Sequence, residues 1–187
     1  MKRIAIFASG SGSNFEAIVE AYRNGELKGE PTVCVCDKPG AGVISRANRL
    51  GVPVIVASPK DFTDKGAFER YVGERLRELE IDLICLAGYM RLVGPTLLEM
   101  YGGKIINIHP SLLPAFKGAH AIRDAFEYGV KVYGVTIHYV DETLDGGKII
   151  SQRAIAYEGN DIEELEREIH RIEHRLYPET INKVLSL

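Results

Sequence analysis

The stretch "IINIHPSLLP" (105–114) places an amide and an imidazole two positions apart at the end of an apolar run. Because side chains alternate between the two faces of a strand, Asn107 and His109 are expected to share one face. An amide that donates a hydrogen bond and an imidazole that exchanges a proton can together stabilise a developing oxyanion and move a proton. A single histidine at a strand end is more often structural, but the neighbouring Asn107 and the rigid exit through Pro110 favour a functional role.

A carboxylate that could act with this pair lies further along the chain. The acidic stretch "DETLDGG" (141–147) places Asp145 directly before two glycines, which allow a loop to bend and aim the carboxylate inward. Turns between strands favour Asp and Gly in any case. The residues alone therefore leave Asp145 open between a turn residue and a functional acid.

A glycine-rich loop, "SGSGSN" (9–14), follows the first apolar run and precedes a helical pattern. Glycines let the backbone approach a ligand, and free amides at a helix N-terminus attract anions. Gly10 and Gly12 match the start of the dinucleotide fingerprint G-x-G-x-x-G, but Phe15 occupies the place of its third glycine. The loop therefore favours a single phosphate over a dinucleotide, with a plain turn and helix cap as the alternative. The expected phosphate ligands are Gly12, Ser13 and Asn14.

Apolar runs of strand length alternate with helical periodicity as far as His109. Runs that are apolar throughout and separated by amphipathic helices predict a parallel sheet covered on both faces. Strands are expected at 3–8, 32–36, 52–57, 82–88 and 104–109, and helices after the glycine loop and at 41–50, 64–79 (with Asp64 as N-cap) and 95–101.

The rhythm changes after residue 130. The segments 131–140 and 146–157 are longer and alternate more strongly, and an acidic, glycine-containing turn joins them. This pattern predicts an antiparallel addition at the edge of the sheet. A last helix is expected at 161–176. The predicted fold class is α/β, with a Rossmann-like, mostly parallel sheet flanked by helices in a single domain spanning 1–187.

Composition narrows the class of protein. The 187 residues are 45% hydrophobic and 26% charged, which is typical of a globular domain with a real core. The formal net charge of −3 argues against nonspecific nucleic-acid binding, and no window approaches the ~18 apolar residues of a membrane span. The first apolar run is shorter than a signal sequence requires, so a cytoplasmic protein is expected. Cys34 and Cys36 are expected to be core thiols rather than metal ligands.

Five motifs occur in a recognisable order: "SGSGSN", "AGYMRLV", "INIHPSLLP", "LDGG" and "EHRLYP". Together they resemble the folate-dependent formyltransferase superfamily over essentially the whole chain, and the first and last motifs resemble its glycinamide ribonucleotide branch. The resemblance implies an enzyme that transfers a formyl group from 10-formyltetrahydrofolate to the amine of 5-phosphoribosylglycinamide in purine biosynthesis. It implies small-molecule partners without metal, nucleic acid or membrane, and it leaves a homodimer open.

The resemblance also implies roles for individual residues. Asn107 and His109 would stabilise a tetrahedral intermediate, and Asp145 would assist proton transfer. The implied substrate-binding residues are Gly12, Ser13, Asn14 and Glu173. The implied folate-binding residues are Lys65, Met90, Arg91, Leu92, Val93, Asn107, Val140 and Asp141. On this basis the domain divides into a phosphate-binding half, about 1–100, and a folate-binding and catalytic half, about 101–187.

Three alternatives remain open. Lys117 stands where many glycinamide-type members carry proline, so another 10-formyltetrahydrofolate-dependent formyltransferase, such as the methionyl-tRNA enzyme, is the first. The second is a zinc peptidase, because "HRIEH" (170–174) matches an inverted zinc motif with His170 and His174 on one helical face. The third is a noncatalytic nucleotide-binding module that uses only the glycine loop. A module of that kind would be indifferent to changes at Asn107 or His109.

Overall fold

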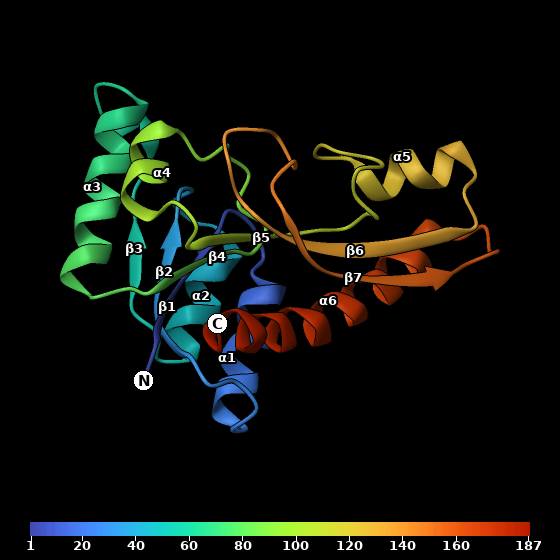
Figure 1. Cartoon of the computed structure of the whole chain (residues 1–187), viewed down its shortest axis with the longest axis horizontal. Coiled ribbons are helices and arrows are strands. Elements are labelled where there is room, and N and C mark those ends of the chain that lie inside the picture. Colours follow the sequence, from blue (N-terminus) through green and yellow to red (C-terminus); the bar gives the residue numbers. More distant parts are fainter.

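The computed structural model describes residues 1–187 and is built on one seven-stranded sheet with the order β3-β2-β1-β4-β5-β6-β7 (Figure 1). The strands are β1 (Arg3–Ala8), β2 (Glu30–Cys36), β3 (Val54–Val56), β4 (Leu83–Leu86), β5 (Ile105–His109), β6 (Val132–Tyr139) and β7 (Ile149–Ala156). β1 to β5 pair in parallel, whereas β6 pairs antiparallel with both β5 and β7. The predicted fold class, including its antiparallel edge, is confirmed.

Helices connect the strands and pack on both faces of the sheet (Figure 1). They are α1 (Ser13–Arg23), α2 (Gly42–Arg49), α3 (Lys65–Glu78), α4 (Pro95–Tyr101), α5 (Ala121–Tyr128) and α6 (Ile162–Leu185), with a short 3-10 turn η1 at Pro59–Asp61. Asp64 caps α3 as predicted, since its side chain accepts a hydrogen bond from the amide of Ala67 at 2.7 Å. None of the helices combines the length and the apolar character that crossing a membrane needs.

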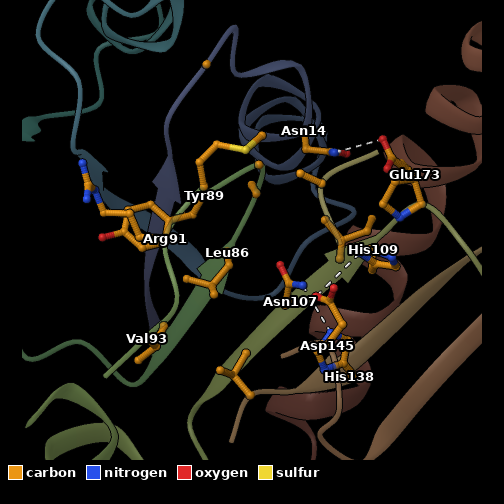
Figure 2. Close-up of a pocket in the computed structure, with 18 of the residues that line it drawn as sticks. Asn14, Leu86, Tyr89, Arg91, Val93, Asn107, His109, His138, Asp145 and Glu173 are labelled. Carbon is orange, nitrogen blue, oxygen red and sulfur yellow. Dashed lines mark hydrogen bonds and ion pairs between the residues drawn. The ribbon is translucent and has the colours of Figure 1, made fainter. Parts of the chain in front are cut away.

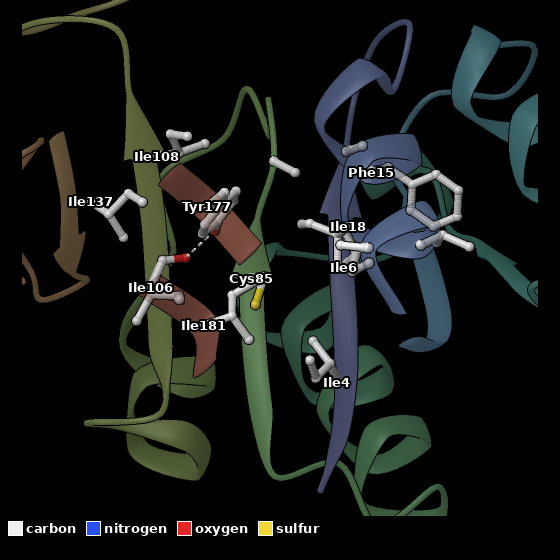
Figure 3. Packing of buried hydrophobic residues seen from close by; sticks show 14 of the residues in the cluster. Ile4, Ile6, Phe15, Ile18, Cys85, Ile106, Ile108, Ile137, Tyr177 and Ile181 are labelled. Carbon is white, nitrogen blue, oxygen red and sulfur yellow. Dashed lines mark hydrogen bonds between the residues drawn. The ribbon is translucent and has the colours of Figure 1, made fainter. Parts of the chain in front are cut away.

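Alternation along the central strands divides the core into two layers. In β1, Ile4 and Ile6 point to the layer covered by α1, α2 and α6, whereas Ala5 and Phe7 point to the layer covered by α3 and α4. Figure 3 shows the first layer, in which side chains from β1, β4, β5 and β6 meet those of α1 and α6. Both faces of the central strands are buried, and this explains why their sequences are apolar throughout.

The cysteines belong to this core. Cys34, Cys36 and Cys85 are buried free thiols, as expected for the first two. Burial raises the pKa of Cys34 to about 12, so its thiolate is scarce at neutral pH.

The last helix is longer than predicted. The sequence predicted a helix over 161–176, but α6 continues to Leu185 and passes through Pro178. A proline inside a helix costs about 3 kcal/mol because it removes a hydrogen bond and crowds the preceding turn. Here Tyr177 and Ile181, on either side of Pro178, are fully buried against the sheet. Tertiary packing outweighs the local cost of the proline.

The connection between β5 and β6 contains a helix that the sequence did not predict. α5 is short, and the residues that it buries are Ala121 and Ala125. Small residues give a weak apolar periodicity, so the helix is not evident from the pattern. The predicted strands at 52–57 and 82–88 are also shorter in the structure, at Val54–Val56 and Leu83–Leu86.

Candidate active site

A cavity of about 590 Å³ opens beyond the carboxyl ends of β1, β4 and β5 (Figure 2). This is where parallel α/β sheets bind ligands, and the volume is sufficient for an organic molecule of moderate size. The residues that line it are 10–14, 86–93, 107–110, Gly118, Ala119, His138, Val140, 143–145, His170 and Glu173.

Asn107 and His138 meet because of the register between β5 and β6. The two residues are direct partners across the antiparallel pair, and Asn107 Nδ2 lies 3.2 Å from His138 Nε2. The Nδ1 atom of His138 lies 2.9 Å from the carbonyl oxygen of Tyr139, which can only accept. Nδ1 therefore carries the proton, and Nε2 accepts from the amide of Asn107. One N–H of Asn107 is held by His138, and the other is left for a ligand.

His138 is buried and is held in its neutral form. Removal from water lowers the pKa of His138 below its ordinary value, and this effect exceeds the opposing influence of its bond to Tyr139 and of the Asp145 carboxylate. Only the neutral ring can accept a hydrogen bond from Asn107. The low pKa and the orientation of the Asn107 amide are therefore linked.

His109 and Asp145 face each other in the same wall of the cavity (Figure 2). His109 Nδ1 lies 3.7 Å from Asp145 Oδ1, which is an ion-pair distance when the ring is protonated. On its other side, His109 Nε2 donates to the carbonyl oxygen of Phe116 at 2.9 Å, and Asp145 Oδ2 accepts from the amide of Gly118 at 2.8 Å. We call Asn107, His109, His138 and Asp145 the polar wall.

Two loop residues, one in the polar wall and one beside it, have left-handed backbone conformations. Phe116 has φ 51° and Asp145 has φ 48°. Asp adopts this region more readily than most residues, whereas Phe does so rarely. Strain of this kind costs about 1–3 kcal/mol per residue and persists where surrounding contacts maintain it. Gly147 allows the Asp145 loop to pass close to β6, because a Cβ there would overlap the carbonyl oxygen of Tyr139.

The exit from β5 is held by buried polar groups as well as by its prolines. Thr136 is the direct partner of His109 in the β5–β6 register. Its hydroxyl donates to the carbonyl oxygen of Ser111 at 2.7 Å and accepts from the amide of Leu113 at 3.1 Å. The side chain of Gln152, on β7, donates to the same hydroxyl at 3.0 Å. The chain after His109 is thus fixed by the antiparallel edge of the sheet.

The glycine loop presents unpaired amides to the other end of the cavity. Gly12, at the start of α1, has φ 80°, and a Cβ there would lie 2.5 Å from Cγ2 of Val43. Glycine is therefore required both by the backbone and by the packing against α2. The amide groups of residues 12–15 have no hydrogen-bond partner within the chain. Free amides at a helix N-terminus form a site for an anion.

Glu173 brings a buried carboxylate from α6 to the glycine loop. Its Oε2 accepts from Asn14 Nδ2 at 3.1 Å and from His170 Nδ1 at 2.8 Å, and the side chain is only 5% exposed (Figure 2). The bond to Glu173 raises the pKa of His170 above its ordinary value. Asn14 Oδ1 is buried and has no partner. The cluster can accept hydrogen bonds from a hydroxyl or an amine of a ligand.

The segment from Gly88 to Gly94, between β4 and α4, forms the wall opposite the polar wall. The peptide groups of residues 91–93 make no hydrogen bond within the chain, although these residues line the cavity. Unpaired backbone donors and acceptors need a partner, which a ligand can supply. The side chain of Arg91 is held by the fully buried Asp37, with Arg91 Nε donating to Asp37 Oδ2 at 2.7 Å.

Most of the residues predicted for binding line this cavity, but two do not. Lys65 is the first residue of α3 and lies beside Gly94, just outside the lining. Asp141 is exposed, and its carboxylate accepts from the amide of Thr143 at 2.8 Å, so it braces the loop that carries Asp145. Lys117 is also exposed.

The geometry gives no support to the zinc-peptidase alternative. His170 and His174 stack on α6 with ring centroids 6.4 Å apart, but His170 is engaged by Glu173. Burial lowers the pKa of His174, whose Nε2 is enclosed without a partner. No group of three His, Cys, Asp or Glu residues is arranged to hold a metal ion.

His138 and His170 line the cavity but were not predicted to act there. His138 is the single histidine in an otherwise uncharged strand, which is a weak signal in the sequence. Its significance depends on the register of β6 against β5, and no local pattern specifies that register. The sequence pattern assigns His170 only to the zinc-peptidase alternative.

The molecule combines a Rossmann-like sheet with an antiparallel edge, a glycine loop with unpaired amides, and a wall that contains Asn107, His109 and Asp145. The chain belongs to the Formyl transferase family, whose sequence profile matches residues 2–181. This finding confirms the family predicted from the motifs.

Individual members of the family are similar to this chain in both sequence and structure. The chain is 53% identical to "Phosphoribosylglycinamide formyltransferase" of Bacillus subtilis (strain 168) over 188 aligned positions, which cover 100% of this chain and 96% of that protein. The crystal structure of phosphoribosylglycinamide formyltransferase from Bacillus halodurans superposes with a TM-score of 0.95 at 54% identity, covering 99% and 96% of the two chains. Glycinamide ribonucleotide transformylase 1 from Geobacillus kaustophilus has a TM-score of 0.96 at 55% identity, covering 99% of each chain.

Proposed function

We propose that the chain transfers a formyl group from 10-formyltetrahydrofolate to the amine of 5-phosphoribosylglycinamide in purine biosynthesis. The observation that carries this proposal is the composition of one cavity. Unpaired amides of a glycine loop, the polar wall and a stretch of unpaired peptide groups all line the same space. The names of relatives that are 53% and 55% identical, phosphoribosylglycinamide formyltransferase and glycinamide ribonucleotide transformylase, support the amine substrate and the formyl transfer.

The phosphate of the amine substrate fits the amides of residues 12–15. These donors need no basic side chain, because the N-terminus of α1 already favours an anion. Asn14 Oδ1 and the carboxylate of Glu173 lie next to the loop and are suited to ribose hydroxyls or to the glycinamide. The amine at the far end of such a substrate would then reach toward the polar wall.

The pterin of the folate fits the 88–94 segment. A flat heterocycle with alternating donors and acceptors can pair with the free peptide groups of residues 91–93. Met90 and Leu92, which are 64% and 53% exposed, and the nearby Val140 offer apolar cover for its ring. Lys65, outside the cavity, would contact only a part of the folate that extends past Gly94.

The chemistry requires a C–N bond to form and another to break. The substrate amine attacks the formyl carbon, and the carbonyl oxygen becomes an oxyanion. Asn107 donates its free N–H to this oxygen, and His109 donates from Nε2 once its bond to Phe116 is released. Removing one such donor costs about 2.7–4 kcal/mol of transition-state stabilisation.

Collapse of the intermediate breaks the bond between the formyl carbon and N10 of the folate. The proton lost by the attacking amine must reach N10, so that tetrahydrofolate and the formylated amide leave as neutral groups at these atoms. Asp145, 3.7 Å from His109 Nδ1, stabilises the protonated ring while the proton is in transit.

A direct assay tests this proposal. The purified chain is mixed with 10-formyltetrahydrofolate and phosphoribosylglycinamide, and formation of tetrahydrofolate is followed spectroscopically. We expect turnover that depends on the complete acceptor. Glycinamide without the phosphoribosyl group, methionyl-tRNA and a reaction without acceptor are the controls. Turnover with methionyl-tRNA but not with phosphoribosylglycinamide would overturn the substrate, and no turnover with any acceptor would overturn the activity.

A further inference from the structure

Glu69 is a buried carboxylate that lies outside the cavity but touches the backbone next to it. It belongs to α3 and is 3% exposed. Its Oε1 accepts from the amide of Gly94, and its Oε2 accepts from the amide of Leu97 at 3.1 Å. Both partners are backbone groups at the start of α4. A buried charge with two hydrogen bonds to one short stretch of backbone fixes that stretch in place.

The start of α4 cannot cap itself. Its N-cap residue, Gly94, has no side chain, and Pro95 at the first helical position has no N–H group. Gly94 and Leu97 are buried residues, so their amides need an acceptor within the protein. Glu69 supplies that acceptor from another helix, and its negative charge at the N-terminus of α4 is favoured by the helix dipole.

Gly94 and Glu69 fit each other sterically. A Cβ at position 94 would lie 2.8 Å from Oε1 and 2.9 Å from Oε2 of Glu69. The backbone of Gly94, with φ −92°, is accessible to any residue. Glycine is therefore needed here for the approach of the carboxylate and not for the shape of the backbone.

The contact lies directly beside the unpaired peptide groups of the cavity. Gly94 follows Val93, and the peptide groups of residues 91–93 are free for a ligand. The other end of the segment is tied to Ser9, whose amide donates to the carbonyl oxygen of Gly88 at 3.0 Å and whose hydroxyl accepts from the amide of Met90 at 2.9 Å. Glu69 holds the Gly94 end of the 88–94 segment through its hydrogen bond to the amide of Gly94.

We propose that Glu69 is a positioning residue for folate binding: through Gly94 and Leu97 it sets the place of the peptide groups of residues 91–93. This inference rests on the proposed function, because it takes the folate as the ligand of that segment. Glu69 touches no substrate. Its effect is on the affinity for the folate and not on the chemistry at the polar wall.

The first experiment replaces the carboxylate by an amide of the same shape. In E69Q the side chain keeps one acceptor and turns an N–H toward a backbone N–H, so one bond is lost. We expect the KM for 10-formyltetrahydrofolate to rise about tenfold, in line with one lost charge-assisted bond. The kcat and the KM for the amine substrate should stay within about twofold. E74Q, which changes an exposed acid on the same helix, is the matched control and should match the unaltered chain.

A second experiment uses the steric fit. G94A should raise the KM for the folate as E69Q does, because the new methyl group displaces the carboxylate. In an E69A background, where the space is empty, adding G94A should have little further effect. If G94A changed the KM for the folate only through the backbone at position 94, its effect would be the same with and without the Glu69 side chain. Equal effects of G94A in both backgrounds would overturn the inference.

The outcomes separate this inference from the proposed function. If the unaltered chain turns over but E69Q lowers only the free energy of unfolding and leaves the KM for the folate unchanged, Glu69 is a structural brace and the inference is wrong. If the unaltered chain shows no turnover, binding of tetrahydrofolate is measured by fluorescence titration. A tenfold weaker Kd in E69Q then supports the inference without the activity, and absence of binding by the unaltered chain overturns both.

Discussion

The polar wall and the loops that support it contain two pairs of residues that are positioned by different means. Asn107 and His138 belong to adjacent strands, and the β5–β6 ladder makes them direct partners. Asp145 and Phe116 belong to loops and have left-handed backbones. Phe116 is tied to His109 by one hydrogen bond, and Asp145 is held by the amide of Gly118 and faces His109. The strand pair is fixed by a ladder of many bonds, whereas the loop pair depends on a few.

The two pairs differ in how easily their side chains can be reoriented. A side chain on the ladder cannot change direction unless the register of the sheet changes. A side chain on the loops can change direction when one local bond is lost. Substitutions on the strands should therefore affect only the chemistry of the group removed, and substitutions on the loops should affect chemistry and local order together.

The largest effect is expected at Asn107. N107A removes an oxyanion donor while the ladder stays intact, so kcat should fall about 10²–10³-fold. Steady-state kinetics with both substrates measures this loss, and thermal unfolding should remain a single cooperative transition. N48A, an exposed asparagine on α2, is the control. Near-normal turnover in N107A would instead favour the noncatalytic nucleotide-binding module.

The next effect is expected at Asp145, where charge and loop geometry can be separated. D145N keeps the acceptor for Gly118 and tolerates the left-handed backbone, so it tests the charge alone. We expect kcat to fall about 10²-fold in D145N with little change in stability. D145A removes the bond to Gly118 as well and should cost a further ~1 kcal/mol in the free energy of unfolding. Equal stability of the two variants would contradict the view that the loop depends on this bond.

Gly12 tests a loop that is fixed by packing. G12A introduces a Cβ that would lie 2.5 Å from Val43 at a residue with φ 80°. We expect a loss of about 1–3 kcal/mol in the free energy of unfolding, measured by denaturant titration, and a higher KM for the phosphorylated substrate. G10A is the control, because a Cβ at Gly10 meets nothing within 4 Å. A similar loss of stability in both variants would show that a side chain destabilises the loop for a reason other than the contact with Val43.

The smallest effect is expected in the pH dependence of stability through His138. Its pKa is lowered from 6.5 in the folded chain, so the unfolded chain binds the extra proton as the pH falls below 6.5. Stability should therefore decrease with acidification in this window, by at most about 1.4 kcal/mol per pH unit from this residue. Denaturant unfolding at a series of pH values measures the slope.

H138Q should make that slope shallower without removing it, because the pKa of His174 is also lowered. His170 acts in the opposite sense: its raised pKa gives a contribution that is lost as the pH rises above 6.5. An unchanged slope below 6.5 in H138Q would mean that the ring is not held neutral in the folded state.

The strand side of the site could be predicted from the sequence, because it depends on local rules. Period two places Asn107 and His109 on one face, and the alternation of apolar runs and helices places that face at the carboxyl end of a parallel sheet. Both expectations match the structure.

The features that the sequence did not predict depend on contacts between residues that are distant in the chain. His138 contacts Asn107 only because β6 pairs with β5. Phe116 and Gly118 contact the polar wall only because their loop folds back onto it. α6 continues through Pro178 only because the residues on both sides of the proline are buried. None of these contacts leaves a periodic trace in the sequence.

Tyr177 links α6 to the strands β4 and β5, whose ends line the cavity. It lies one helical turn beyond Glu173 on α6, and its hydroxyl donates to the carbonyl oxygen of Leu86 at 2.8 Å and lies 3.3 Å from that of Ile106. Leu86 is where the wall around the 88–94 segment begins, and Ile106 directly precedes Asn107. The hydroxyl of Tyr177 thus holds α6, which carries Glu173, against β4 and β5. These are the strands that lead to the 88–94 segment and to Asn107. The proposed sites for the amine substrate and for the folate are therefore both tied to α6 through Tyr177, and a sliding motion of α6 would disturb both at once.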